Sequence, residues 1–221
     1  MARAAATVRS NGETRESILA AALRAFAAKG FDGSSTREIA TSAGVNHGLI
    51  PYYFGSKQKL WRAAVELAFA DMKAGLEAIL ADPSLGDDRE RAARMIRGYV
   101  HFVARHPEFV RLMHEEGKRR GPRMRWIVDR HAKPLYEVIT ILLERGRAGG
   151  GLRIDTPPVH FFYLLAGAVG VIFHQAEECK RVSGVDPFDP QVVEEHARAV
   201  ELFLLGPPRE GAGAAPEGDE S

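Results

Sequence analysis

Helical periodicity constrains this 221-residue chain more than any other sequence feature. Apolar side chains recur three and four residues apart almost throughout, and no segment shows the strict alternation of a half-buried strand. The first helix is expected from about Thr14 to Lys29, with Ile18, Ala22 and Phe26 on one face. Gly30 follows, where a left-handed C-cap is expected. The pattern predicts an all-α fold.

Two short helices are expected next, separated by a glycine turn. Ser35 with Glu38 three residues later has the spacing of a capping box and opens the first of them. Gly44 can adopt the positive φ of a tight turn, and Asn46 is a strong N-cap for a second helix over 47–54. Two short helices joined in this way after a longer one predict a helix-turn-helix.

Such a motif places its second short helix in the major groove of DNA, while the first braces it from the backbone side. Thr36 and Arg37 open the first short helix, where hydroxyl, guanidinium and free N–H groups can address phosphates. Lys57 can add a further phosphate contact. A small helical cap without DNA function would show the same geometry, so this pattern alone leaves both interpretations open.

Charge favours the first interpretation. The net charge is only +1, but residues 1–60 hold 8 Lys and Arg against 4 Asp and Glu, so the basic excess lies in the N-terminal part. A basic segment on a slightly acidic body suits a polyanionic partner. No uncharged apolar run could cross a bilayer, residues 2–12 do not resemble a secretory signal, and the single Cys179 can form neither a disulfide framework nor a zinc site. We expect a cytoplasmic protein without membrane contact.

The rest of the chain is expected to form a helical body, with breaks where Pro and Gly oppose helix continuation. Pro134 falls inside one expected helix and predicts a kink or a helix start there. The expected helices span 57–81, 87–105, 107–117, 123–147, 157–182 and 190–205.

The last two of these helices offer more apolar surface than one subunit easily covers. Residues 159–182 mix large apolar side chains with small ones such as Gly167, and the helix over 190–205 adds further apolar positions. We expect a homodimer through a four-helix bundle, with two helices from each subunit. The alternative is that both helices are buried within one monomer.

A ligand cavity in the body would need apolar walls with a few polar groups. Candidates are the polar, aromatic or sulfur-containing side chains on otherwise apolar helices, namely Tyr99, Phe102, Met113, His114, Trp126, Tyr136, Tyr163 and His174. A metal site using His114 or His174 with neighbouring glutamates is a weaker alternative, because the order of ligands is reversed from that of carboxylate-rich bundles. No motif indicates an enzyme, a metal or a cofactor.

The N-terminal sequence resembles the TetR family of bacterial transcription regulators. The resemblance spans about residues 13–61 and rests on Ile18 to Ala22, Phe26 to Phe31, Ser35 to Ala40, Ala43-Gly44-Val45, Tyr53 to Lys57 and Leu60. It implies an all-α homodimer with an N-terminal DNA-binding domain and a C-terminal domain that binds an effector and dimerises. By position, it carries DNA contacts over to Ser35, Thr36, Arg37, Asn46, His47, Gly48, Tyr52, Tyr53 and Lys57.

With this resemblance, the chain divides into a flexible arm over 1–12, the DNA-binding domain over 13–60, the effector-binding and dimerisation domain over 61–205, and a disordered tail over 206–221. We expect a ligand-responsive repressor that binds a palindromic operator as a homodimer and responds to a small, largely apolar effector. The alternative is an all-α module that binds a small molecule or a metal without DNA function.

One residue departs from the family pattern. Pro51 stands where many relatives place an aromatic residue that reaches the DNA. In the fifth position of a helix, proline removes one hydrogen bond and clashes with the carbonyl of His47. We therefore expect a distorted recognition helix that reads DNA through Asn46, His47, Tyr52 and Tyr53. Pro51 is also the best argument for the alternative function.

Overall fold

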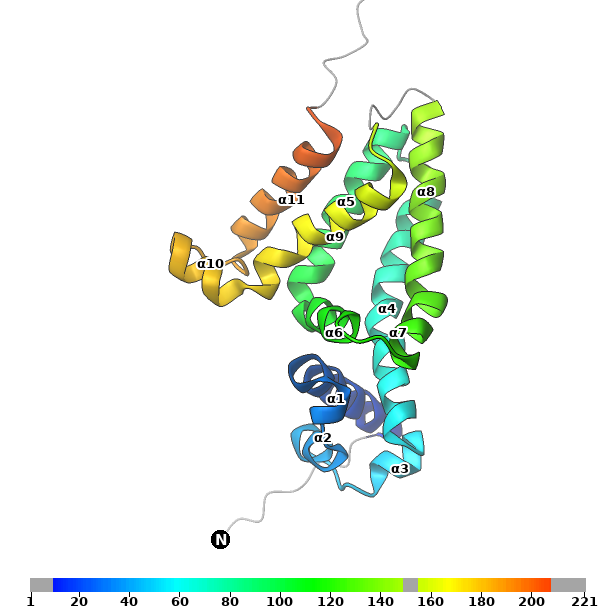
Figure 1. Ribbon diagram of the computed structural model, residues 1–221, viewed down its shortest axis with the longest axis vertical. Coiled ribbons are helices and arrows are strands. Elements are labelled where there is room, and N and C mark those ends of the chain that lie inside the picture. The colour runs from blue at the N-terminus through cyan, green and yellow to red at the C-terminus, as the bar shows by residue number, and fades with distance from the viewer. Residues whose placement is uncertain (1–9, 149–154, 208–221) are drawn as a thin grey trace, which may run out of the picture.

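The computed structural model describes residues 10–148 and 155–207, and within these ranges it contains helices and no strand. Three helices, α1 (Asn11–Gly33), α2 (Thr36–Ala43) and α3 (Leu49–Phe54), form a unit at one end of the molecule. A long helix, α4 (Lys57–Ala81), leads from this unit into a larger helical body (Figure 1). The expected all-α fold is confirmed. Most of the expected arm and of the expected tail lies outside the described residues.

Helix α1 begins earlier than the sequence predicts. Ser10 and Glu13 form a reciprocal capping box: the Ser10 N–H donates to the Glu13 carboxylate at 2.7 Å, and the Glu13 N–H donates to Ser10 Oγ at 3.2 Å. This satisfies two N–H groups that have no acceptor inside a helix, so α1 starts at Asn11 instead of Thr14. At the other end, Gly30 has the predicted positive φ, +68°, and separates a last short turn from the main helix.

The N-terminus of α2 differs from the expected capping box. Ser35 Oγ accepts a hydrogen bond from the N–H of Arg37 at 3.2 Å, whereas the Glu38 carboxylate pairs with Lys29 Nζ of α1 at 2.9 Å. Glu38 therefore joins two helices and does not close its own, so the capping box at Ser35 was wrong. The left-handed turn at Gly44 is confirmed, with φ 67° and ψ 36°.

Helix α3 begins at Leu49, two residues later than predicted. Asn46 Oδ1 accepts from the N–H of Gly48 at 2.8 Å, which folds 46–48 into a tight turn before the helix. Pro51 is then the third helical residue, where the missing N–H would have had no partner inside the helix. Its carbonyl still accepts from the Gly55 N–H at 2.9 Å. The expected distortion at Pro51 was therefore wrong, because it rested on a helix start at His47.

The core of the N-terminal unit is formed where α1 crosses α2 and α4. Ile18 and Phe26 of α1 are fully buried, as are Ile39 of α2 and Trp61 of α4. Ile50 of α3 is buried in the same cluster. These side chains hold α1 and α3 against α4 and hold α2 against α1. The outer surfaces of α2 and α3 therefore face away from the body (Figure 1).

The body consists of the remaining helices. Helix α5 packs against α4, α8 and α9, and α8 also packs against α9. Helix α6 lies against α1, and α11 packs on α5 and α9. The bounds are α5 (Asp88–Arg105), α6 (Pro107–Gly117), α7 (Pro122–Ile127), a π-helical turn η1 (Val128–Ala132), α8 (Lys133–Ala148), α9 (Pro158–His174), α10 (Ala176–Ser183) and α11 (Pro190–Leu205).

Two of the predicted body helices are divided. The one over 123–147 is interrupted by η1 directly before Pro134, which is the second residue of α8, so the predicted kink or helix start is confirmed. The one over 157–182 breaks at Gln175, where α9 and α10 meet at 74°. The apolar sequence ends at Phe173, and charged residues follow. If α9 continued straight, these charged side chains would lie against the apolar helices of the body.

No single described helix is both long and apolar enough to cross a membrane, and α9 with α10 reaches that length and composition only as a bent pair.

Candidate nucleic-acid interface and ligand cavity

The turn between α2 and α3 presents polar side chains on the end of the molecule that faces away from the body. His47 and Tyr52 are exposed, Tyr52 to 75%. Thr36 Oγ1 lies 3.1 Å from His47 Nε2, so the start of α2 and the turn before α3 are tied together. Ser35, Arg37, Asn46 and Gly48 are exposed around them. These residues therefore form one surface, as a DNA-reading face requires.

Tyr53 and Lys57 lie at the edge of this surface and have internal partners. The Tyr53 hydroxyl donates to Asn11 Oδ1 at 3.1 Å, which ties α3 to the first turn of α1. Lys57 Nζ sits 4.6 Å from the centre of the Phe31 ring in a cation–π contact. Both side chains are half-buried. They anchor this surface as well as bordering it.

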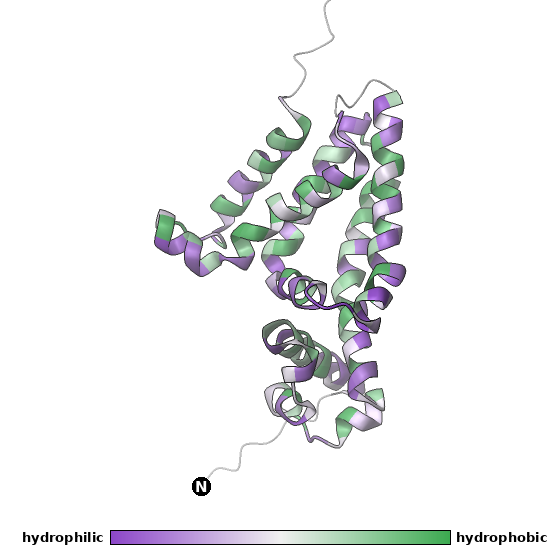
Figure 2. Ribbon diagram, in the orientation of Figure 1, coloured by the Kyte–Doolittle hydropathy of each residue, from purple (hydrophilic) through white to green (hydrophobic). Residues whose placement is uncertain are grey.

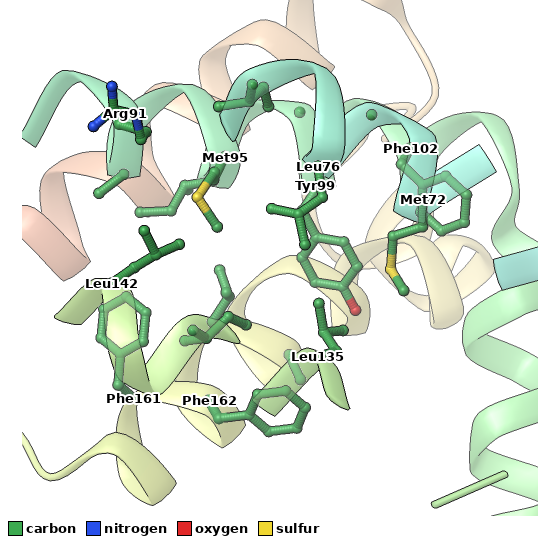
Figure 3. Close-up of a pocket in the computed structure, with 18 of the residues that line it drawn as sticks. Met72, Leu76, Arg91, Met95, Tyr99, Phe102, Leu135, Leu142, Phe161 and Phe162 are labelled. Atoms are coloured by element: carbon green, nitrogen blue, oxygen red, sulfur yellow. The ribbon is translucent and has the colours of Figure 1, made fainter. Parts of the chain in front are cut away.

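A cavity of about 510 Å³ lies in the body between α4, α5, α8 and α9. Its walls are mostly apolar, and Figure 3 shows Arg91 at one end and Phe102 and Met72 towards the other. The volume and apolar lining are those of a small-molecule site. The lining residues are Asp71, Met72, Ala74, Gly75, Leu76, Ile79, Asp88, Arg91, Ala92, Met95, Ile96, Gly98, Tyr99, Phe102, Arg105, His106, Leu135, Ile139, Leu142, Leu143, Phe161, Phe162, Leu165 and Ala166.

Of the eight predicted ligand residues, only Tyr99 and Phe102 line this cavity. The other six do not, because each packs against another element or faces outward. Trp126 contacts the Trp61 ring, Tyr136 contacts the Phe162 ring, His114 stacks on His174, Met113 packs on the core, and Tyr163 is 68% exposed. An aromatic on an apolar helix looks the same in sequence whether it faces a cavity or another ring.

The prediction missed most of the cavity wall. Met72, Leu76, Met95, Leu142 and Phe161 carry no polar group, and nothing in the sequence separates them from ordinary core positions. Arg91 is the exception, because a charged residue among the apolar positions of α5 is visible in the sequence as a candidate ligand-binding residue. Which helices surround the cavity depends on tertiary packing, which local sequence patterns do not predict.

Tyr99 brings a polar group into the middle of the cavity. Its ring lies between Leu76 and Leu135, with the hydroxyl directed towards α8 (Figure 3). Burial raises the pKa of Tyr99 to about 12, because a phenolate would lose its hydration. The hydroxyl is therefore neutral at physiological pH and available as a donor.

His114 and His174 form a stacked pair between α6 and α9, with ring centres 4.4 Å apart. Burial lowers the pKa of His174, and the neighbouring His114 lowers it further. In residues 10–148 and 155–207, no three His, Cys, Asp or Glu side chains come together as metal ligands could. The pair is thus a packing contact between two helices of the body.

A group of polar contacts joins the body to the N-terminal unit, at the place where α6 meets α1. Arg123 donates through Nε to both carboxylate oxygens of the buried Glu116, at 3.1 and 3.2 Å, and its guanidinium lies 4.3 Å from the Phe31 ring centre. Asp32 pairs with Arg119. Together with the continuous helix α4, this junction links the cavity-bearing body to the exposed surface of α2 and α3.

Both parts of the chain match models of one protein family. Residues 18–64 match "Bacterial regulatory proteins, tetR family", and residues 89–201, more than half of the chain, match "Tetracyclin repressor-like, C-terminal domain". The chain belongs to the TetR family. It is thus a DNA-binding transcriptional regulator, and the surface of α2 and α3 corresponds to the part of the family that carries the helix-turn-helix.

Named relatives agree with this membership. The chain is 33% identical over 159 residues to the HTH-type transcriptional repressor NicS of Pseudomonas putida, covering 69% of this chain and 72% of that protein. It is 28% identical over 145 residues to the HTH-type transcriptional repressor AcnR of Corynebacterium efficiens, covering 65% and 71%.

Solved structures show the same fold at lower identity. The ketosteroid transcriptional regulator KstR2 of Mycobacterium tuberculosis superposes with a TM-score of 0.70 at 21% identity, over 92% of this chain and 97% of that one. The regulator FadR of Bacillus subtilis, in complex with stearoyl-CoA, gives 0.64 at 18% identity, over 87% and 99%.

Proposed function

We propose that this TetR-family regulator is a repressor that binds a palindromic operator as a homodimer and is released by a small, largely apolar effector. Residues 13–60 bind DNA, and residues 61–205 bind the effector and dimerise. In this proposal Ser35, Thr36 and Arg37 contact phosphates, while Asn46, His47, Gly48 and Tyr52 face base edges. Tyr53 and Lys57 hold the reading face and reach the backbone at its border. Two of the named relatives are repressors, which supports repression over activation.

The observation that carries the proposal is the path of α4. This single helix starts at Lys57 beside the reading face and lines the cavity from Asp71 to Ile79. Trp61, near its start, is fully buried against the N-terminal unit. A ligand that displaces the far half of α4 therefore moves the DNA-reading surface of α2 and α3 with it. Ligand binding and DNA binding then favour different positions of α4, so each weakens the other.

An exposed apolar face supports the dimer. Tyr163, Leu164 and Val171 of α9 and Leu202 and Phe203 of α11 are exposed, while their helices bury other side chains against the body. Figure 2 shows apolar positions along both helices. Large apolar side chains exposed on two neighbouring helices indicate an interface, and two such helices from each subunit make a four-helix bundle. Two reading heads on one dimer would match the two halves of a palindrome.

The cavity supports an apolar effector of moderate size. Its walls come mainly from Leu, Ile, Met and Phe, and its volume suits one small molecule. One structural neighbour, FadR of Bacillus subtilis, was crystallised with stearoyl-CoA, so a fold of this type accommodates a long acyl chain.

The proposal is tested by measuring binding of the full chain to labelled DNA fragments upstream of its own gene, by fluorescence anisotropy at low and moderate salt. We expect one fragment to bind specifically, with two protomers per site. Leu76→Trp would fill the cavity and leave the DNA face intact, so this variant should bind DNA but no longer be released by apolar molecules. Leu67→Trp, at an exposed position of the same helix that does not line the cavity, is the matched control. Absence of specific binding to any such fragment would contradict the proposal.

A further inference from the structure

Two hydrogen-bond donors in the cavity wall have no partner in the described part of the chain. Nε of Arg91 is buried and unpaired. The hydroxyl of Tyr99 lies among the apolar side chains of the cavity wall and makes no hydrogen bond with the described residues. Leaving a buried donor unsatisfied is costly, and native proteins rarely do so without a reason. Both residues lie on α5 and both line the same cavity, so one bound molecule could contact the Arg91 side chain and the Tyr99 hydroxyl together.

From these donors we infer that the effector is an elongated, mainly apolar carboxylic acid whose carboxylate binds Arg91 and which carries a second oxygen where it passes Tyr99. The inference rests on the proposed function, because it assumes that the cavity is the effector site. Arg91 and Tyr99 are eight residues apart on one helix, which corresponds to about 12 Å along its axis. Met95, one turn before Tyr99, lines the stretch between them.

The Arg91 end can accept an anion. Its guanidinium is already held in place, with Nη2 donating to the Leu85 carbonyl at 3.2 Å and Nη1 lying 3.4 Å from Asp88 Oδ1. These contacts use one N–H of each terminal nitrogen and leave a second N–H on each, whereas Nε is sealed from the cavity. The side chain is 21% exposed, so it is largely shielded from water yet not fully enclosed. A fixed arginine with a spare N–H on each terminal nitrogen is a suitable partner for a carboxylate oxygen.

At the opposite end the basic side chains already have partners, which favours the Arg91 end for the head group. His106 lies between two carboxylates there, with Asp71 at 3.7 Å from its Nε2 and Glu108 at 3.5 Å from its Nδ1. The cation at this end, Arg105, is exposed and donates through Nε to the carbonyl of His101. The apolar end of the ligand would therefore lie towards Phe102 and Met72, with the head group at Arg91.

The Tyr99 hydroxyl would donate a hydrogen bond to an oxygen partway along the ligand chain. A neutral phenol can donate one hydrogen bond to a carbonyl or hydroxyl oxygen, and no side chain in the described part of the cavity wall competes for it. A plain hydrocarbon at this point would leave the donor unsatisfied. An oxygenated acid would therefore be preferred over the unsubstituted acid of the same length.

The test compares head groups on one chain length, by calorimetric titration of the full-length protein with laurate, methyl laurate and dodecanol. We expect laurate to bind at least tenfold more tightly than the ester or the alcohol, because only the acid forms a charge-assisted hydrogen bond with Arg91. Arg91→Met should remove this difference and leave dodecanol binding unchanged. Arg94→Met, an exposed arginine on the same helix that does not line the cavity, should keep it. Equal binding of the three compounds to the unmodified protein would overturn the inference.

The second oxygen is tested with hydroxylaurates substituted at successive carbons. At least one position should bind more tightly than laurate, and Tyr99→Phe, which removes only the hydroxyl, should abolish that gain and preserve laurate binding. If no substituted acid gains affinity, or if Tyr99→Phe keeps the gain, the inference fails. A failure of the proposed function looks different: none of the compounds would then bind in the cavity, and none would release operator DNA.

Discussion

Replacing His131 with Phe should make the stability of this protein less sensitive to acid. His131 is fully buried in the π-helical turn η1, with its ring stacked on Phe69 at 4.3 Å. Neither ring nitrogen has a hydrogen-bond partner in the described residues. Burial lowers the pKa of His131 from 6.5 to about 4, opposed by Glu66, whose carboxylate lies 3.8 Å from Nε2.

The direction and size of the effect follow from proton linkage. Between pH 6.5 and about pH 4, the unfolded chain binds a proton at His131 that the folded protein does not, so stability falls as the pH falls. Between pH 7 and pH 5 this one group should lower the free energy of unfolding by about 2 kcal/mol, and by about 3 kcal/mol once the pH is well below 4. Above pH 7 both states are neutral at this residue and the contribution disappears.

Urea denaturation at pH 7 and pH 5 measures the effect. In the His131→Phe variant, the loss of unfolding free energy between these two pH values should be smaller by about 2 kcal/mol. Burial also lowers the pKa values of His174 and His196, but both remain in the variant and cancel in the comparison. His160→Ala, at an exposed position, is the control and should behave like the unmodified protein. Equal losses in the unmodified protein and the Phe variant would refute the reasoning.

Other substitutions test separate parts of the molecule. His47→Ala should weaken specific binding by about 1–3 kcal/mol and relax the choice of particular bases; an equal loss on all sequences in a competition assay would contradict its role. Lys57→Ala should weaken binding on every sequence and lower the slope of log affinity against log salt by about one, and a sequence-selective loss would argue against a phosphate contact. Gly167→Glu should split the dimer without unfolding the chain, because nothing lies within 4 Å of the added Cβ; an unchanged sedimentation coefficient would remove α9 from the interface. Gly44→Ala should cost about 1–2 kcal/mol of stability because φ is +67° there, and an unchanged urea midpoint would show that the turn tolerates a side chain.

Local patterns were sufficient wherever a helix boundary depends on nearby residues. The helix over 57–81 was predicted to the residue, because Ser56 caps its start and Asp82-Pro83 ends its pattern. Those over 107–117 and 190–205 are also confirmed, since Pro opens both. The turn at Gly44 followed from the conformational freedom of glycine. His47 and Tyr52 were predicted to be exposed, and they are.

Errors arose where a side chain had a choice of partners. Glu38 could close a capping box or reach Lys29 on another helix, and spacing along the chain cannot decide between them. Asn46 could cap a helix at His47 or form a turn, and this choice moved Pro51 from a disruptive position to a harmless one. The break at Gln175 was missed because the apolar periodicity gives no bend angle.

The sequence by itself determined that the chain is helical, where the helix-turn-helix lies, and which residues face outward from it, because each depends on spacings within one or two helical turns. Only the tertiary structure decided which side chains surround the cavity. Leu76, Leu142 and Phe161 are far apart in the chain, and they meet because α4, α8 and α9 pack around a space that they do not fill. Such a space is a property of how helices cross, and apolar residues look alike in sequence whether they face it or one another.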